Sequence, residues 1–194
     1  MALLPAFLAL AGAVQSAPSA DEQALFAAFK GVCARVRSLP AMASAARRQG
    51  WQAVSPEAHP GLDRLVNGGR AEVLAREPDA RLAGAQFRRK VGQRQLWLAL
   101  SRYQDAEGAW SNGCRMYDFD AAAPIAPAAL EALMGRPSTG TQPLPGGQTK
   151  YLWEPGWKSG HGVEVSFIAG QDDPLVRKFG LKGQILTAQA IGGF

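Results

Sequence analysis

Hydrophobic and polar residues alternate most regularly in residues 96–120, LWLALSRYQDAEGAWSNGCRMYDFD. The large apolar residues at its start occupy every second position: Leu96, Leu98 and Leu100. This two-residue period is typical of a β-strand with one buried face. Turn residues follow, and Gly108 can adopt the positive φ that closes a short hairpin loop. The return strand then places four residues on one face: Trp110, Asn112, Cys114 and Met116. The pattern predicts a β-hairpin around which the rest of the chain is organised.

A helical pattern precedes this hairpin. Five residues fall on one stripe at helical spacing: Leu25, Phe29, Val32, Cys33 and Val36. Ser19 and Glu22 have the spacing of a capping box, which predicts the start of the helix, and Pro40 ends or redirects it. If a signal peptidase cuts after Ala20, this box is lost, and Asp21 alone would favour the helix N-terminus. We expect a second short helix over about residues 40–49, because Gly50 is a typical helix stop. Trp51 should then fold back as a hydrophobic anchor.

Shorter patterns fill the rest of the chain. Alternation predicts strands over four further stretches: residues 85–91, 150–154, 163–169 and 184–191. A short helix is expected between Pro124 and Gly135. Residues 55–70 and 136–148 are rich in Pro and Gly and are predicted to be loops, the first with one helical turn. Residues 71–76 fit a strand and a helix end equally well.

These elements predict an α+β fold: a single antiparallel sheet built around the 96–120 hairpin, with the N-terminal helices packed on one face. An antiparallel sheet is favoured because the clearest strand pair is a tight hairpin and no helix alternates regularly with the strands. The alternative is a mostly β barrel with a peripheral helix. With 194 residues, 47% of them hydrophobic and 19% charged, the chain has the size and composition of one globular domain.

The first twenty residues have the pattern of a targeting segment. Residues 3–14 are apolar or Gly, about as long as the core of a signal peptide and too short to span a bilayer, and small residues follow them. We therefore expect a signal peptide over residues 1–20 and a single α+β domain over residues 21–194. The mature chain is expected to be periplasmic or secreted and to have no transmembrane segment. The alternative is a buried N-terminal helix.

Export would decide how the two cysteines behave, because disulfides form and persist in oxidising compartments. Cys33 lies on the apolar stripe of the first helix, and Cys114 lies on the return strand of the hairpin. In an exported protein the two predict one disulfide that joins helix to sheet, whereas in the cytosol they would be buried free thiols.

The formal net charge of +5 favours acidic partners such as lipid headgroups or anionic envelope polymers. Four basic residues form a patch in the sequence: Arg88, Arg89, Lys90 and Arg94. The competing interpretation is an ordinary solvated face. Nucleic acid is not an expected partner, because binding it needs aromatic residues interleaved with the basic ones and only Phe87 stands nearby.

The sequence offers little that points to metal, cofactor or catalytic chemistry. The candidate metal ligands include no close-spaced pair, so no metal site is expected: they are His59, His161, Cys33 and Cys114. No cofactor is expected either, because the chain has no phosphate-binding glycine motif. An enzymatic alternative is a hydrolase in which His161 acts with Ser159 or with the paired carboxylates Asp118 and Asp120. No G-x-S-x-G motif supports it.

The most suggestive stretch for binding is residues 151–161, YLWEPGWKSGH. Its candidate binding residues are Tyr151, Trp153, Trp157, Lys158 and His161. Pro155 cannot donate to a strand ladder, so the segment should lie at an edge, a bulge or a turn. Aromatic side chains beside a turn suit stacking on a sugar ring or on an apolar side chain of a partner. The competing interpretation is that one or both tryptophans cap the open end of the sheet.

These patterns favour a small exported binding or accessory protein of a bacterial-type envelope, without catalytic activity. Its expected partner is an envelope protein, a glycan or an anionic surface. The alternatives are an envelope-directed hydrolase and a structural domain whose β-rich surface pairs with another chain.

Overall fold

The computed structural model describes residues 17–170 and 173–194, so most of the predicted signal peptide, residues 1–16, lies outside the described residues. The described residues form one antiparallel sheet in the order β1-β2-β3-β4-β8-β7-β6-β5. The strands are β1 (Gln52–Val54), β2 (Arg81–Val91), β3 (Arg94–Gln104), β4 (Trp110–Asp118), β5 (Gly140–Pro143), β6 (Thr149–Trp153), β7 (Gly162–Ile168) and β8 (Gly183–Gly192).

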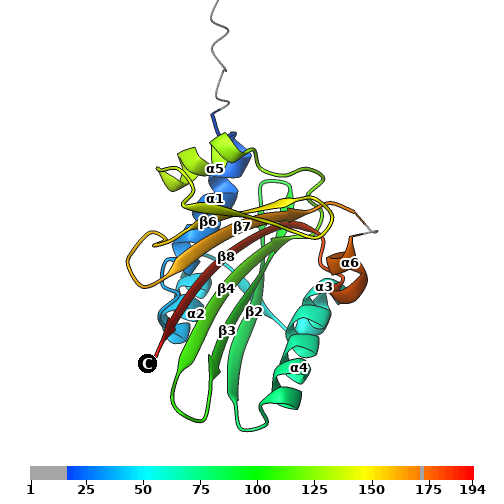
Figure 1. Cartoon of the computed structure of the whole chain (residues 1–194). Helices are drawn as coiled ribbons and strands as arrows, with labels where there is room; N and C mark the ends of the chain where they lie inside the picture. Colours follow the sequence, from blue (N-terminus) through cyan, green and yellow to red (C-terminus); the bar gives the residue numbers. More distant parts are fainter. Residues whose placement is uncertain (1–16, 171–172) are drawn as a thin grey trace, which may run out of the picture.

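Helical segments lie on both sides of this twisted sheet. They are α1 (Ala20–Cys33), α2 (Leu39–Arg48), the 3-10 turn η1 (Pro56–Ala58), α3 (Pro60–Asp63), the π-helical turn η2 (Arg64–Gly68), α4 (Gly69–Arg76), α5 (Pro127–Met134) and α6 (Pro174–Phe179). Figure 1 shows α1 and α2 on one side of the sheet and α3 and α4 on the other. The predicted α+β fold, with one antiparallel sheet and N-terminal helices packed on one face, is confirmed.

The predicted hairpin consists of β3 and β4 in the middle of the sheet. Leu98 pairs with Met116 and Leu100 pairs with Cys114, so the alternating apolar residues of both strands point to the same face. All four side chains are buried in the main hydrophobic core. Gly108, in the turn between the strands, has a φ of 99°, the backbone conformation predicted for it.

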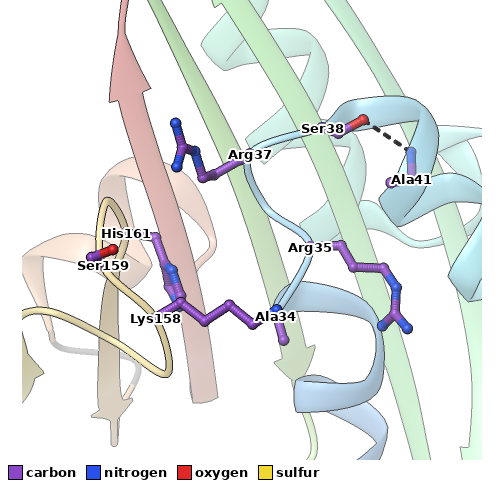
Figure 2. A pocket seen from close by; sticks show the side chains of 8 residues that line it. All are labelled: Ala34, Arg35, Arg37, Ser38, Ala41, Lys158, Ser159 and His161. Atoms are coloured by element: carbon purple, nitrogen blue, oxygen red, sulfur yellow. Dashed lines mark hydrogen bonds between the residues drawn. The ribbon is translucent and has the colours of Figure 1, made fainter.

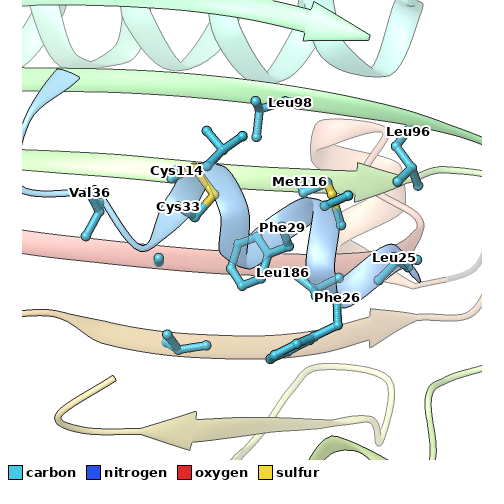
Figure 3. Close-up of a cluster of buried hydrophobic side chains, with 14 of the residues drawn as sticks. Leu25, Phe26, Phe29, Cys33, Val36, Leu96, Leu98, Cys114, Met116 and Leu186 are labelled. Carbon is cyan, nitrogen blue, oxygen red and sulfur yellow. A yellow bond between two sulfur atoms is a disulfide. The ribbon is translucent and has the colours of Figure 1, made fainter. Parts of the chain in front are cut away.

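Helix α1 begins at the predicted capping box. The Ser19 hydroxyl accepts a hydrogen bond from the Glu22 N–H at 3.2 Å, and the Glu22 carboxylate accepts one from the Ser19 N–H at 2.7 Å. The helix ends at Cys33, well before Pro40. All five residues of the predicted apolar stripe have no exposed surface: Leu25, Phe29, Val32, Cys33 and Val36. Figure 3 shows this stripe packed against the inner face of β3, β4 and β8.

Cys33 and Cys114 form the predicted disulfide, which joins the last turn of α1 to the middle of β4 (Figure 3). Their Cα atoms are 5.4 Å apart, a distance within the usual range for a disulfide. The bond therefore fixes the point at which α1 leaves the sheet.

Helix α2 matches its predicted position closely. The Ser38 hydroxyl caps it by accepting a hydrogen bond from the Ala41 N–H at 3.3 Å. Pro40 stands in the first turn, where the missing N–H is not needed. Gly50 follows the helix with a φ of 76°, and Trp51 is buried in the core, as predicted.

The prediction of a loop over residues 55–70 is wrong, because helical turns follow one another from Pro56 to Arg76. Pro56 and Pro60 each stand in a first turn, the one helical position that tolerates proline. His59 caps the second turn through its Nδ1, which accepts the Gly61 N–H at 3.1 Å. A count of Pro and Gly misses such helices, and the undecided residues 71–76 belong to α4.

These helices and α6, which was not predicted, cover part of the second face of the sheet. A second buried apolar cluster lies beneath them: Leu62, Trp97, Ala99, Tyr117, Phe119, Ile168 and Ile185. The sequence predicted one covered face, and the structure adds partial cover on the other. Trp97 and Ala99 alternate with the hairpin leucines and belong to this second cluster. Its burial explains why these two positions are apolar as well.

The remaining strands follow the predictions except at the edges. Strands β2, β6, β7 and β8 cover the four predicted stretches, and α5 ends at Gly135, whose φ is 74°. The prediction of a loop over residues 136–148 is wrong in part, because β5 pairs with β6 there. Pro143 ends β5 at the edge of the sheet, where proline interrupts no ladder. The short edge strand β1 was also missed.

The disulfide generates the first prediction. Reduction should lower the free energy of unfolding by at most about 4.5 kcal/mol, the chain-entropy value for a sequence separation of 81 residues. Urea unfolding of the oxidised and reduced protein measures the difference. The double variant Cys33→Ala/Cys114→Ala is the matched control and should not respond to reductant. Two titratable thiols per chain in the oxidised protein would show that the bond does not form.

Candidate functional site

The loop between β6 and β7 is held in a compact turn by hydrogen bonds to His161. The Gly156 N–H donates to the His161 carbonyl oxygen at 2.6 Å. The Trp157 N–H donates to His161 Nε2 at 3.1 Å. Arg136 supports the loop from outside by donating to the Gly156 carbonyl oxygen at 3.1 Å. The predicted turn at Pro155 is therefore real, and His161 organises it from both its backbone and its ring.

Trp153 is a core residue. Its side chain has no exposed surface, and its Nε1 donates to the Arg136 carbonyl oxygen at 3.2 Å. Tyr151 is half-buried and lines a different, small pocket of about 160 Å³ beside Pro127 and Phe167. The core thus encloses the ring of Trp153, one of the predicted binding residues, and the pocket beside Tyr151 is lined by other residues than the pocket at Lys158 and His161.

Trp157 is half-buried against helix α1. Its ring meets the rings of Phe29 and Phe26 edge to face, at centroid distances of 5.3 and 6.0 Å. The Lys30 ammonium lies 6.0 Å from its ring centroid. Trp157 therefore anchors the β6–β7 loop on α1 and leaves part of its surface open.

A pocket of about 370 Å³ opens beside this anchor, and we call it the junction pocket (Figure 2). One wall is the connection from α1 to α2, and the other is the β6–β7 loop. Its lining residues are Ala34, Arg35, Arg37, Ser38, Ala41, Lys158, Ser159 and His161. Of the predicted binding residues, the structure brings Lys158 and His161 to this pocket, with Trp157 adjacent to them in the chain.

The junction pocket is positively charged. Arg35, Arg37 and Lys158 contribute cations, and among the described residues no acidic side chain lines it. The Arg37 guanidinium reaches the opposite wall, because a Cβ placed on Gly160 would lie 3.5 Å from Arg37 Nη1. Figure 2 shows Arg37 on the side of Ser159 and His161, while Arg35 points away from them. Arg35 also donates to the Gly31 carbonyl oxygen at 2.6 Å, which ties it to α1.

His161 is held in one tautomer. Its ring is only 5% exposed, and burial lowers its pKa, with Lys158 and Arg37 lowering the pKa further. The ring is therefore neutral at pH 7. Because Nε2 accepts the Trp157 N–H, the single ring proton must be on Nδ1. Gly156 packs tightly on the ring edge that contains Nε2: a Cβ there would lie 2.6 Å from His161 Cδ2 and 2.7 Å from Nε2.

The four residues of the predicted basic patch do not form one surface. Strand alternation places Arg89 on the face of the buried Phe87, and Arg88 and Lys90 on the opposite face. Arg88 donates to the side chain of Gln52 at 3.4 Å. Arg94 forms an ion pair with Asp118 at 3.0 Å.

The carboxylates of the hydrolase alternative lie far from His161. Gly162, the neighbour of His161 in the chain, pairs with Gln189 of β8, and Gly113 of β4 pairs with the same residue from the other side. Asp118 lies five residues beyond Gly113 on β4, which is about 17 Å at ~3.3 Å per residue. Asp118 is 3% exposed and paired with Arg94. Ser159, in contrast, lines the junction pocket together with His161.

The other histidine belongs to a separate aromatic cluster on the second face. His59 stacks on Phe119 at 4.3 Å, and Phe119 stacks on Tyr117 at 5.2 Å. Burial lowers the pKa of His59, while Asp120 raises it and Lys182 lowers it. Within residues 17–170 and 173–194, no group of three or more His, Cys, Asp or Glu side chains gathers in a metal-binding arrangement.

Half of the junction pocket was not predicted from the sequence. The predicted binding residues did not include Arg35, Arg37 or Ser38. The signal that could have identified them is the close spacing of two arginines just after Cys33, because the disulfide fixes where this connection crosses the sheet.

Comparisons of this chain with protein-family models, with curated proteins and with solved structures found no match. Within the described ranges, no helix combines the length and the apolar composition that crossing a membrane requires. The geometry of the junction pocket is therefore the basis for proposing a function.

The lowered pKa of His161 generates the second prediction. The unfolded chain takes up this proton near the ordinary value of 6.5, whereas the folded chain resists it. The stabilising contribution is therefore present above pH 6.5 and is lost as the pH falls through that value towards the lower folded pKa. The free energy of unfolding, measured in urea between about pH 5 and 8, should decline below 6.5, and less steeply for His161→Gln.

His59→Gln is the matched comparison, because burial also lowers the pKa of His59. Each variant should remove part of the decline. A His161→Gln curve as steep as that of the unmodified protein would contradict the account.

Proposed function

We propose that this chain is an exported, non-catalytic binding protein of a bacterial-type envelope that holds an acidic group of its partner in the junction pocket. The observation that carries the proposal is the composition of the pocket: three cationic side chains line it, with no acidic side chain among the described lining residues. Such a site attracts anions.

Export is supported by two features of the chain. The Cys33–Cys114 disulfide is of a kind that persists in oxidising compartments. The apolar stretch at residues 3–14 has the length and flanking small residues of a signal peptide. Both are expected of a periplasmic or secreted protein.

Binding is favoured over hydrolysis by the state of His161. A general base needs a free ring nitrogen within reach of the proton that it removes. His161 Nε2 is instead engaged by the Trp157 N–H at 3.1 Å. No carboxylate supports the ring from the pocket side among the described lining residues, and Asp118 and Asp120 lie at the other end of β4.

A hydrolase remains the second candidate because Ser159 and His161 line the same pocket. Such an enzyme would turn over ester substrates at a rate that Ser159→Ala abolishes. Binding without turnover is the result expected from our proposal.

Trp157 gives the site an apolar component. It is half-buried on α1 and immediately precedes Lys158, which lines the pocket. An aromatic ring beside cations is a common composition for an anchor in an interface. A partner that carries acidic groups on a sugar or glycerol backbone could contact both.

The third prediction tests the pocket with defined polymers. Polyglycerol phosphate or polygalacturonate should bind, as measured by isothermal titration calorimetry, and neutral dextran should not. Arg37→Ala and Lys158→Ala should each weaken binding about tenfold, since a hydrogen bond to a charged group contributes about 1.5–3 kcal/mol. Binding should also weaken as salt rises to physiological strength, because charges are screened over about 8 Å there.

The matched controls are Arg88→Ala and Lys90→Ala. Each removes one positive charge, as each test variant does, but from the face of β2 opposite the buried Phe87. Both should bind as the unmodified protein does. If they lose affinity while Arg37→Ala and Lys158→Ala do not, the basic strand residues are the site and the junction pocket is not. If none of the polyanions binds, the proposed function is wrong.

A further inference from the structure

Most polar side chains of the junction pocket are hydrogen-bond donors. Arg37 and Lys158 can only donate. Arg35 has the same chemistry, although one of its nitrogens is engaged by the Gly31 carbonyl oxygen. The lining side chains therefore differ from a mixed polar site, in which carboxylates or amide oxygens would accept hydrogen bonds from a ligand.

Ser38 and His161 each keep a hydrogen that can be donated to a ligand. The Ser38 oxygen already accepts the Ala41 N–H at 3.3 Å, which leaves its hydroxyl hydrogen to donate. His161 Nε2 already accepts the Trp157 N–H, which leaves the Nδ1 proton to donate. No acceptor among the described residues takes that Nδ1 proton, although the side chain is 5% exposed. Among the lining side chains, only the hydroxyls of Ser38 and Ser159 can still accept a hydrogen bond as well as donate one.

The ring orientation of His161 is fixed. Its Cδ2–Nε2 edge packs on Gly156, so the Nδ1 edge faces away from the turn. The N-terminus of α2, marked by Ser38 and Ala41, lies on the facing wall and adds its partial positive charge. Both walls of the pocket thus carry hydrogen-bond donors.

We infer that the group held in the junction pocket is an oxyanion whose oxygens only accept hydrogen bonds, such as a phosphodiester or a carboxylate. A phosphate group that carries a proton would bring an O–H into a site whose lining side chains offer only two serine hydroxyls as acceptors, and an unpaired polar group costs binding energy. This inference rests on the proposed function and specifies the chemical class of its ligand. His161 is then a specificity-determining residue that acts as a neutral donor.

Two probes of equal charge separate the classes. Dimethyl phosphate carries one negative charge and no proton. Methyl phosphate, below its second pKa of about 6, carries the same charge and one O–H group. At about pH 5, calorimetry should find methyl phosphate bound at least about fivefold more weakly than dimethyl phosphate. Comparing the affinities for acetate and dimethyl phosphate shows whether the pocket prefers a carboxylate or a phosphodiester. Uncharged trimethyl phosphate should not bind.

His161→Gln tests the donor directly. The glutamine can still accept the Trp157 N–H in place of Nε2 but has no donor in place of Nδ1. At pH 7, dimethyl phosphate should bind at least about fivefold more weakly to this variant, while the near-ultraviolet circular dichroism of the loop tryptophans stays unchanged. His59→Gln, on the other face of the sheet, should bind normally. Nitrogen-15 spectra of the unmodified protein should place the His161 proton on Nδ1.

Equal affinity for methyl and dimethyl phosphate, or a proton found on Nε2 of His161, would overturn this inference. The proposed function would still stand if the polymers bound in a manner dependent on Arg37 and Lys158. Absence of polymer binding would instead remove the proposed function, and the inference with it.

Discussion

The attachment of helix α1 to the inner face of the sheet is the constraint on which the rest of the structure depends. Phe29 and Cys33 have no exposed surface, and the disulfide to Cys114 fixes the end of the helix over the middle of β4. The chain must therefore leave the sheet at one defined point. Trp157 packs on the same helix through Phe29, so the connection to α2 and the β6–β7 loop meet there. The junction pocket is the space between them.

The basic residues of the junction pocket are brought together only by the tertiary structure. Arg37 and Lys158 are far apart in the sequence and come from different elements, yet they line one pocket. The basic residues that adjoin in the sequence, Arg88 to Arg94, are instead divided between two faces or paired with Asp118. Strand alternation separates sequence neighbours, and tertiary packing joins distant residues. A run of basic residues in a strand is thus a poor guide to an anion site.

The sequence was sufficient for the features that depend on local patterns. Three features each have a period or spacing that is typical of one kind of element: the alternating leucines of the hairpin, the capping box at Ser19 and the apolar stripe with Cys33. The helical turns between Pro56 and Arg76 were missed because proline in a first turn resembles proline in a loop. The short edge strands β1 and β5 carry too few residues for a period to show.

Only one wall of the candidate site could be predicted from the sequence, because only that wall has a local pattern. The β6–β7 loop drew attention through Trp157, Lys158 and His161, whose types and turn context are visible in the sequence. The opposite wall depends on where α1 is held by the disulfide, which no local pattern specifies. The tautomer of His161, which supports the proposed binding function, depends on a backbone N–H four residues earlier.

The measurement that tests the central claim most directly is a map of backbone amide chemical shifts during titration with polyglycerol phosphate. The account predicts that the amides that move most are those of residues 34–41 and 157–161, on the two walls of the junction pocket. Amides of residues 88–94 and of the aromatic cluster at His59 should stay in place. Shifts concentrated at residues 88–94, with the two walls unaffected, would contradict the claim that this pocket is the binding site.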